Sequence, residues 1–455
     1  MLDRRQVIKA SLVTLAASTG VARPTMAAAA KSNATGESSP ENWVDDSTGH
    51  RIVRLSSEPG TKALYFNQNG YTPEGDILIV HSPSGISGIN LATREQKPIL
   101  ERPNIKLLFT GRKTRRVYFT KLQPGGTDSD AEATPDKPLT IEAVDVDSGE
   151  VSDVATITRG SIASINCDET LLLGSFAERE FSLQPGSKGR DSKTGQTKYA
   201  ATGPDGKPLS YADAKEVRMD DRLEAKIPME MFTVDVANGE VKTVHRATDW
   251  LNHLQFSPTD PNLIMFCHEG PWHKVDRIWT IRTDGSDLTK IHTRMMNMEI
   301  AGHEFFAPDG KKIWYDLQTP RGEDFWLASY DQETGKRQWF HLQRNEWSVH
   351  FNVAPDESVF AGDGGNEDMV AHAPDGKWIY LFKPMPIPDV AGIKARNAAD
   401  LVSPGYLDAE KLVNMEGHDY RLEPNITFTP DMKGIVFSSN MHGDPHVYMV
   451  LIDRP

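Results

Sequence analysis

The chain gathers imidazole, carboxylate and guanidinium side chains between residues 250 and 306. This stretch contains the segments WLNHLQFSP, FCHEGPWHKVDRIW and AGHEFFAPDG, and with them His253, His268, Glu269, Arg277 and His303. An imidazole titrates near neutral pH and can bind a metal ion, whereas a guanidinium can hold a carboxylate. The composition of this stretch therefore predicts a catalytic pocket.

A recurring turn phrase indicates which elements position these side chains. In each copy an apolar residue leads into a turn of Pro, Asp or Gly, and a short run rich in β-branched and aromatic residues follows. Pro presets φ for the turn, and the run after it is typical of a strand. The copies are YTPEGDILIV from Tyr71, FSPTDPNLIMF from Phe256, FAPDGKKIWY from Phe306, VAPDESVFAG from Val353 and FTPDMKGIVF from Phe428.

A second phrase alternates with the first and completes a repeat. Each copy is an extended run that ends in a polar turn with Gly, as an outer hairpin would: VDVDSGEV, VDVANGEV, IRTDGSDL and YDQETGKR. Alternation of the two phrases predicts an all-β chain folded as a seven-bladed β-propeller, in which neighbouring blades bury one another's faces. The expected blades lie near 51–98, 99–155, 156–245, 246–293, 294–341, 342–390 and 415–455.

The N-terminal segment has the features of an export signal. Arg4 and Arg5 precede a weakly apolar stretch and a run of small residues, which resembles a twin-arginine (Tat) signal. We therefore expect a signal peptide over 1–30, a disordered linker over 31–45, a propeller domain over 46–455 and a periplasmic location. A basic amphipathic N-terminus of a cytosolic protein is the alternative, and the apolar stretch is too short to span a membrane.

Composition and charge narrow the class of partner. The formal net charge of −14 argues against nucleic acid, which requires a basic face. It does not exclude an anionic sugar, because a local group of Arg and His can hold a carboxylate. Cys167 and Cys267 fall in different repeats, where two unpaired thiols or one disulfide are both compatible with the sequence. No stripe of residues predicts an oligomeric state.

Three inserts interrupt the repeats, and the first of them, 123–138, is a polar loop without periodicity. Residues 181–228 contain YADAKEVRMDDRLEAKIPM, which indicates a short helix, and residues 383–415 suggest a helix near 391–401. Long loops of a propeller often gather on its functional face, so Arg222 is a candidate to approach a substrate. A solvated surface insert is the alternative for this residue.

Several of these segments together resemble the oligogalacturonate lyases of polysaccharide lyase family 22. They are CHEGPWHKVDRIW, GHEFFAPDG, VHFNVAPDESVFAGDGG, NITFTPDMKGIVFSS and, near the start, LYFNQNGYTPEGD. The resemblance implies a seven-bladed propeller that cleaves uronate oligosaccharides by β-elimination, with a divalent metal, typically manganese, at the central channel. In this reaction a base removes a proton next to a carboxylate whose charge must be neutralised, and a 4,5-unsaturated uronate is released.

The resemblance also implies roles for individual residues. His303 stands at the position of the family's base, and Arg277 at that of its substrate-facing arginine. A satisfied channel histidine and an Arg277–Asp276 ion pair are the structural alternatives. Candidate substrate-binding residues that line the pocket are Gln68, Arg222, His253, His268 and Glu269.

The expected metal site departs from the family pattern. His350 matches a metal ligand, but Tyr420, Glu423 and Asn425 stand where the family has a Gln and a His-x-His pair. Such an oxygen-rich set favours Mn²⁺, Mg²⁺ or Ca²⁺ over Zn²⁺. Alternatively, the metal is lost and Arg421 or another cation neutralises the carboxylate. The departure leaves a second hypothesis open, namely a non-catalytic periplasmic TolB-like propeller that binds a glycan or a protein.

Overall fold

The computed structural model describes residues 41–123, 126, 131–178, 201–389 and 392–454. All of them belong to one compact unit, Ser39–Pro455. Strands dominate this unit and are arranged in six sheets, so the expectation of an all-β chain is confirmed. The expected signal peptide (1–30) lies outside the described residues.

Four sheets are four-stranded antiparallel meanders. The first contains β3 (Lys62–Ala63), β4 (Ile77–Ser82), β5 (Gly85–Asn90) and β6 (Gln96–Glu101). The second contains β7 (Ile105–Thr110), β8 (Arg116–Lys121), β9 (Leu139–Asp145) and β10 (Val151–Ile157). The third contains β11 (Ser161–Ile165), β12 (Leu171–Ala177), β13 (Met229–Asp235) and β14 (Val241–Ala247). The fourth contains β15 (Trp250–Phe256), β16 (Leu263–Glu269), β17 (Ile278–Arg282) and β18 (Thr289–Lys290).

The eight-stranded sheet joins two further meanders. One contains β19 (Ile300–Phe306), β20 (Lys312–Gln318), β21 (Phe325–Asp331) and β22 (Arg337–Leu342). The other contains β23 (Phe351–Val353), β24 (Phe360–Gly362), β25 (Trp378–Pro386) and β26 (Ser403–Asn414). They meet where β22 pairs in parallel with β26, so dividing the sheet there gives two four-stranded units. The short helix η2 (Arg344–Glu346) connects them.

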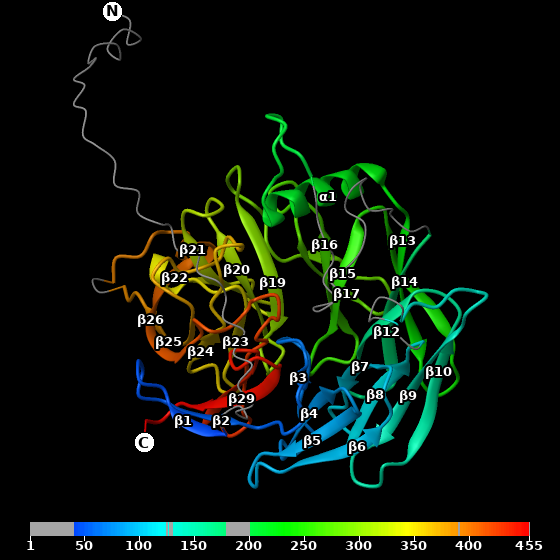
Figure 1. Cartoon of the computed structure of the whole chain (residues 1–455). Coiled ribbons are helices and arrows are strands. Elements are labelled where there is room, and N and C mark those ends of the chain that lie inside the picture. Colours follow the sequence, from blue (N-terminus) through cyan, green and yellow to red (C-terminus); the bar gives the residue numbers. More distant parts are fainter. Residues whose placement is uncertain (1–40, 124–125, 127–130, 179–200, 390–391, 455) are drawn as a thin grey trace, which may run out of the picture. The chain divides into compact units, whose positions relative to one another are not determined.

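The five-stranded sheet brings the two ends of the described chain together. It contains β1 (Asn42–Val44), β2 (Arg51–Arg54), β27 (Thr427–Phe428), β28 (Gly434–Ser439) and β29 (His446–Leu451). Strand β2 pairs with β29, with Ile52 opposite Val450, which closes the ring of sheets seen in Figure 1.

This closure corrects two expectations. The first expected repeat (51–98) loses its first residues to the last sheet, because a repeat pattern does not show which distant strand β2 joins. The expected linker (31–45) ends earlier, since β1 begins at Asn42 and pairs with β2. The Trp43 ring packs 5.8 Å from the Tyr448 ring, and this contact orders the edge strand.

The predicted turns form as their residues dictate. In FAPDG the Ala307 N–H donates to the Lys312 carbonyl, and Gly310 adopts φ +73°. In the outer hairpins Asp145, Asp235 and Asp331 each accept a backbone N–H from the residue three positions later. These turns fix the register of the hairpins, so successive side chains alternate between the two faces of each sheet.

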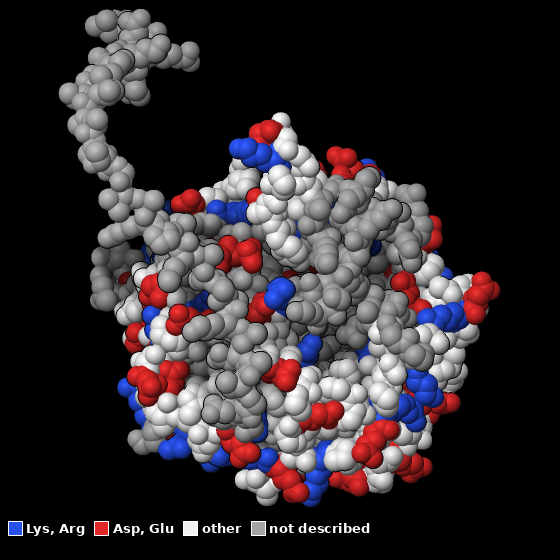
Figure 2. All heavy atoms as spheres, in the orientation of Figure 1, with Lys and Arg blue, Asp and Glu red and all other residues white. Residues whose placement is uncertain are grey.

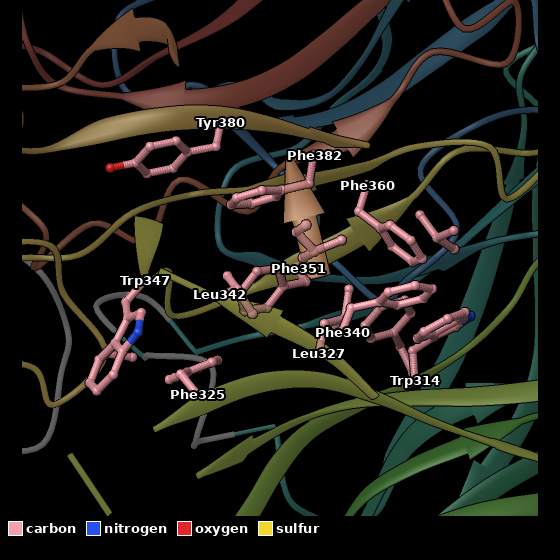
Figure 3. Close-up of a cluster of buried hydrophobic side chains, with 14 of the residues drawn as sticks. Trp314, Phe325, Leu327, Phe340, Leu342, Trp347, Phe351, Phe360, Tyr380 and Phe382 are labelled. Carbon is pink, nitrogen blue, oxygen red and sulfur yellow. The ribbon is translucent and has the colours of Figure 1, made fainter. Parts of the chain in front are cut away.

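Aromatic side chains fill the space between neighbouring units (Figure 3). Trp314 of β20 packs edge-on against Phe360 of β24, and Phe325 of β21 packs against Trp347. Phe66 belongs to the same cluster and contacts Phe305 of β19, with ring centroids 5.9 Å apart. Burying such rings stabilises the fold by about 2 kcal/mol each, and it fixes the inner strands that carry the candidate site.

The two later inserts, 181–228 and 383–415, fold differently. The first contains the predicted helix, α1 (Tyr211–Ala225), whose first turn is capped by the Ser210 side chain. The second does not contain the helix expected near 391–401. Its described residues hold only the short helix η3 (Ala398–Asp400), because the residues after it extend into β26 and pair with β25.

Two surface properties complete the description of the fold. Among the described helices none is both long and apolar enough to span a lipid bilayer. On the face drawn in Figure 2, the acidic and basic side chains of the described residues are mixed with one another.

Candidate functional site

The innermost strands of the sheets converge on the centre of the ring. A cavity of about 650 Å³ is lined by residues of β7, β11, β15, β19, β23 and β27 and by the segment after β3. Figure 1 shows β3, β7, β19 and β23 on the inner side of their sheets. Side chains on these strands therefore meet, although their residues lie far apart in the sequence.

Bulges in two inner strands aim histidines toward this centre. The register of β15 shifts between Asn252 and Gln255, and that of β19 shifts between Gly302 and Phe305. His253 and His303 occupy the bulges with φ of +49° and +47°. A left-handed conformation costs a non-glycine residue about 1 kcal/mol or more, and such strain is concentrated at functional sites.

His303 and His350 form a pair with matching supports. His303 Nδ1 lies 3.0 Å from Asp316 Oδ1, and His350 Nδ1 lies 2.7 Å from Asp363 Oδ2. The two imidazole rings are 4.9 Å apart. Because a carboxylate holds each Nδ1, the Nε2 atom is the one that each ring offers to a proton, a metal ion or a ligand.

The surroundings of His350 are more enclosed than those of His303. His350 is buried against Phe66, and the Tyr65 hydroxyl lies 3.3 Å from His350 Nε2. Burial alone would lower the pKa of His350, but the charge and hydrogen bond of Asp363 outweigh it and raise the pKa. The His303 side chain keeps 29% of its surface exposed, so it remains accessible.

Arg277 lies next to this pair. A methyl group added at Gly302 would lie 3.9 Å from Arg277 Nε and 3.3 Å from Asp316 Oδ1, so both side chains flank the strand just before His303. Arg277 Nη1 donates to Glu269 Oε1 at 3.1 Å, whereas its Nε has no partner among the described residues. The predicted alternative, an ion pair with Asp276, is wrong, because Asp276 pairs with Lys290 and Arg294.

His253 belongs to a buried ion-pair network. Its Nδ1 lies 3.0 Å from Glu304 Oε1, and its Nε2 lies 3.5 Å from Glu269 Oε2. Burial would lower the pKa of His253, but the negative charge of Glu304 raises it above the ordinary value. Burial would raise the pKa values of both glutamates, but the positive charges of Arg277 and His253 lower them.

Atoms of His253, Cys267 and Glu269 lie within 4.8 Å of one another and could hold a metal ion. However, His253 and Arg277 already balance the charges of Glu269 and Glu304 in this group. Cys267 is buried, and burial raises the pKa of its thiol, so the group does not need a cation to be neutral overall. Both Cys167 and Cys267 are free, so the expected alternative of a disulfide is wrong.

The predicted metal ligands do not all face one point. The Tyr420 hydroxyl donates to the Asp363 carbonyl at 2.8 Å and its ring is buried, so Tyr420 supports the partner of His350. Asn425 Oδ1 accepts the Phe66 N–H at 3.3 Å. Burial is the main cause of the raised pKa of Tyr65 and Asp363 of that of His350, and the Glu423 charge adds to both.

The predicted substrate-binding residues also separate. His268 lies on the opposite face of β16 from Glu269, and its ring packs 5.2 Å from Trp279, because successive residues of a strand alternate between faces. Gln68 lines the cavity, and its amide is hydrogen-bonded to backbone groups of Tyr65 and Leu108. Neither residue joins the histidine pair.

The helical insert places two cations near tryptophan rings. Arg222 packs its guanidinium 4.0 Å from the Trp250 ring. Lys215 of the same helix lies 5.5 Å from the Trp272 ring, and its charge lowers the pKa of Glu269 together with the larger effect of Arg277. Helix periodicity alone could not show which of these cations turns inward.

The sequence reasoning missed the two aspartates that support the pair. His303 and Asp316 are 13 residues apart, and so are His350 and Asp363. This repeated spacing was available as a signal, because the first and second strands of neighbouring repeats pair in the same way. Glu304 belongs to the stretch between residues 250 and 306 that predicts a pocket, but no pattern in the sequence indicates that it is the partner of His253.

Comparisons with known proteins agree on one family. The family described as oligogalacturonate lyase matches residues 208–454, which is more than half of the chain. An oligogalacturonide lyase from Pectobacterium atrosepticum is 27% identical over 229 residues, and an oligogalacturonate lyase from Dickeya dadantii is 27% identical over 223. Each match covers 49% of this chain and 55% of the relative, so the chain matches about half the length of these relatives.

Solved structures extend the similarity of the fold to most of the chain. An oligogalacturonate lyase in complex with manganese gives a TM-score of 0.66 at 22% identity, over 90% of this chain and 96% of that one. The oligogalacturonate lyase of Vibrio parahaemolyticus gives 0.67 at 20% identity, over 91% and 96%. The predicted β-propeller class is therefore confirmed.

Proposed function

Because the chain belongs to the oligogalacturonate lyase family, we propose that it cleaves uronate-containing oligosaccharides by metal-assisted β-elimination. The products carry a 4,5-unsaturated uronate. One observation carries this proposal: His303 and His350 lie 4.9 Å apart, each with its Nδ1 held by an aspartate. Two oriented imidazoles beside a buried arginine suit the removal of a weakly acidic proton next to a carboxylate.

His303 is the proposed base. With its Nδ1 proton donated to Asp316, the neutral ring keeps the lone pair of Nε2 for the C5 proton of the uronate. Asp316 also stabilises the imidazolium that forms when this proton is taken. The partial exposure of His303 lets a sugar reach it, whereas the buried His350 is less accessible.

Arg277 is the proposed partner of the substrate carboxylate. Its buried guanidinium keeps a second N–H at Nε without a partner among the described residues. Burial alone would lower the pKa of Arg277, but nearby acidic groups raise it, so the side chain stays charged. A guanidinium facing the carboxylate makes the C5 proton more acidic, because it stabilises the negative charge that develops during elimination.

His350 and Glu423 are the residues that would hold a divalent ion. Their donor atoms are one imidazole nitrogen and carboxylate oxygens, and Asn425 Oδ1 retains a second lone pair. This mixture fits a hard ion such as Mn²⁺, and a structural neighbour is a lyase complexed with manganese. When bound, such an ion supplies positive charge that neutralises the uronate carboxylate.

The site of action belongs to the proposal as well. Residues 1–30 carry the twin-arginine pattern, which supports export to the periplasm. Replacing Arg4 and Arg5 with Lys should retain the protein in the cytoplasm, as judged by cell fractionation. An unchanged periplasmic fraction would contradict the export route without affecting the proposed chemistry.

The activity can be tested by absorbance near 235 nm, where a double bond conjugated to a carboxylate absorbs. Purified protein would be mixed with di- and trigalacturonate and with other uronate oligosaccharides, in Mn²⁺ or in EDTA. We expect a rise with Mn²⁺ that EDTA abolishes. No rise on any substrate, from folded and metal-loaded protein, would contradict the lyase assignment.

A further inference from the structure

The cavity of about 650 Å³ is lined in part by the recurring turns, whereas the histidine pair does not line it. Its lining includes prolines of the recurring turns, such as Pro258, Pro308 and Pro430, but not His303 or His350. Tyr65 and Phe66 line the cavity and also contact the His350 ring, so they stand between the two spaces. The cavity and the histidine pair are thus neighbouring spaces that share these two residues.

Arg112 is the notable cation of this cavity. It lines the cavity from the turn between β7 and β8 and remains in contact with water. No carboxylate pairs with it among the described residues. The surrounding protein lowers the pKa of its guanidinium, which nevertheless stays charged. The other charged groups of the lining do not supply a counter-ion, since Glu74 is bound to Arg115.

The turn that presents Arg112 is held rigidly. Glu169 Oε1 accepts the N–H groups of Lys113 and Thr114 at 2.7 Å each, and Glu169 Oε2 accepts the Tyr118 hydroxyl at 2.9 Å. A side chain on such a turn is positioned before any ligand arrives, which reduces the entropy cost of binding.

A second polar group of the lining lacks a partner. Thr110 is 1% exposed, lines the cavity two residues before Arg112, and its hydroxyl makes no hydrogen bond with any described residue. A buried hydroxyl without a partner costs about 1–3 kcal/mol, so a ligand oxygen that pairs with it gains affinity. Thr110 and Arg112 are thus two donors of the same lining, two residues apart in the chain.

The rest of the lining suits a sugar ring. Tyr65, Tyr71 and Phe306 are partly exposed aromatic residues in the lining, and Ser161 and Ser175 add hydroxyls. A volume of about 650 Å³ falls in the usual range for pockets of small molecules. Aromatic faces with hydroxyls favour a sugar over a small inorganic anion, and Arg112 favours an acidic one.

We propose that this cavity is a second binding site of the protein, in which Arg112 and Thr110 hold the carboxylate of a sugar acid. The choice of a uronate rests on the proposed function, whereas the anion-binding role of Arg112 does not. The site binds either a released monosaccharide or the end of an oligosaccharide, since both present the same carboxylate.

Calorimetric titration with D-galacturonate tests the proposal, because this monosaccharide has no glycosidic bond to cleave. Wild-type protein is compared with Arg112→Gln, Thr110→Val and the matched control Lys113→Gln, which alters the next residue of the same turn. Arg277→Lys reports binding at the histidine pair instead. D-galactose, inorganic phosphate and digalacturonate are the further probes, and circular dichroism checks that each variant folds.

We expect Arg112→Gln to weaken galacturonate binding at least about 10-fold and Thr110→Val several-fold, as for loss of a charged and a neutral hydrogen bond. Lys113→Gln should retain it, Arg277→Lys should retain the part of the binding that depends on Arg112, and galactose should bind weakly or not at all. Digalacturonate binding more tightly than galacturonate would identify the oligosaccharide end as the ligand, and equal or weaker binding the monosaccharide.

Three results would overturn the proposal. They are no binding to wild type, binding that depends on Arg277 but not on Arg112, and phosphate binding that equals galacturonate binding. The lyase assay is independent of this titration. Activity without Arg112-dependent binding would refute the second site alone, and Arg112-dependent binding without activity would refute the lyase alone.

Discussion

Two groups of inner-strand histidines differ in what their ring nitrogens contact. His303 and His350 each have one nitrogen held by an aspartate, and their rings meet edge to face. His253 sits in an equivalent bulge, but Glu304 and Glu269 occupy both of its nitrogens. The same backbone device therefore serves two purposes, and the number of carboxylates around the ring distinguishes them.

The pair His303 and His350 is therefore suited to chemistry, whereas His253 serves the charge balance of its surroundings. A histidine with one nitrogen available can take a proton or bind a metal ion. A histidine between two buried carboxylates has a raised pKa, and its main effect is to stabilise the charges of those carboxylates and to orient Arg277 through Glu269. We therefore expect substitutions in the pair to change rates and substitutions in the network to change stability.

The largest effect is expected at His303. His303→Gln keeps an amide that can donate to Asp316 but cannot serve as a base, so the rate of elimination should fall about 10²–10⁴-fold. Initial rates at 235 nm measure this. His253→Gln is the matched control, and it should lower the rate far less. Equal losses in both variants would remove the distinction between the two groups.

Glu304→Gln tests the network directly. Removing one partner of a buried ion pair leaves His253 with an uncompensated charge and should lower the free energy of unfolding by about 3 kcal/mol. Urea denaturation at pH 6 measures it. Glu95→Gln removes an exposed carboxylate, beside Lys97, and should cost about 1 kcal/mol or less. A smaller loss for Glu304→Gln than for this control would refute a stabilising role of the network.

The free energy of unfolding should depend on pH through the same pair, Glu304 and His253. The lowered pKa of Glu304 adds stability at pH values above the pKa that this glutamate has in the unfolded chain. This stability is lost as the pH falls through its pKa in the folded protein. The raised pKa of His253 adds stability at pH values below the pKa that this histidine has in the unfolded chain. This stability is lost as the pH rises through its pKa in the folded protein. Denaturation from pH 3 to 9 should show a maximum that is flatter in Glu304→Gln. Identical profiles would exclude the pair as the cause.

The smallest effects are expected at the two supporting aspartates, where they should differ in kind. Asp363→Asn should raise the Mn²⁺ concentration that the assay requires about 10–100-fold, because partners of metal ligands contribute that much to metal affinity. Asp316→Asn should lower kcat and shift its pH profile with little change in the Mn²⁺ requirement. The same response in both variants would contradict separate roles for His303 and His350.

The turns and strands of the fold could be predicted because their signals are local. Pro, Asp and Gly specify the turns, and β-branched and aromatic runs specify the strands, so the FAPDG turn and the Asp145 hairpin form as expected. The pairing of β2 with β29 could not be predicted, because it joins residues about 400 positions apart without a distinctive pattern. The supposed helix near 391–401 failed because strand pairing with β25 determined the conformation of the residues after it.

The candidate site was predicted in part. The sequence indicated His303, His350 and Arg277, and the structure brings them together. It also indicated His268, which turns to the other face of β16, and Tyr420, which supports Asp363 from a buried position. Residue type identifies candidates for chemistry, but strand alternation and packing decide which face each side chain occupies.

The sequence by itself therefore determined the all-β repeat, its turns and the residue types available for acid–base chemistry. Only the tertiary structure decided which histidines have a nitrogen that no carboxylate holds and that Arg112 lines the cavity. The physical reason is that turn and strand preferences depend on neighbouring residues. Hydrogen-bond partners, burial and pKa shifts depend instead on side chains that only ring closure brings within a few ångströms of one another.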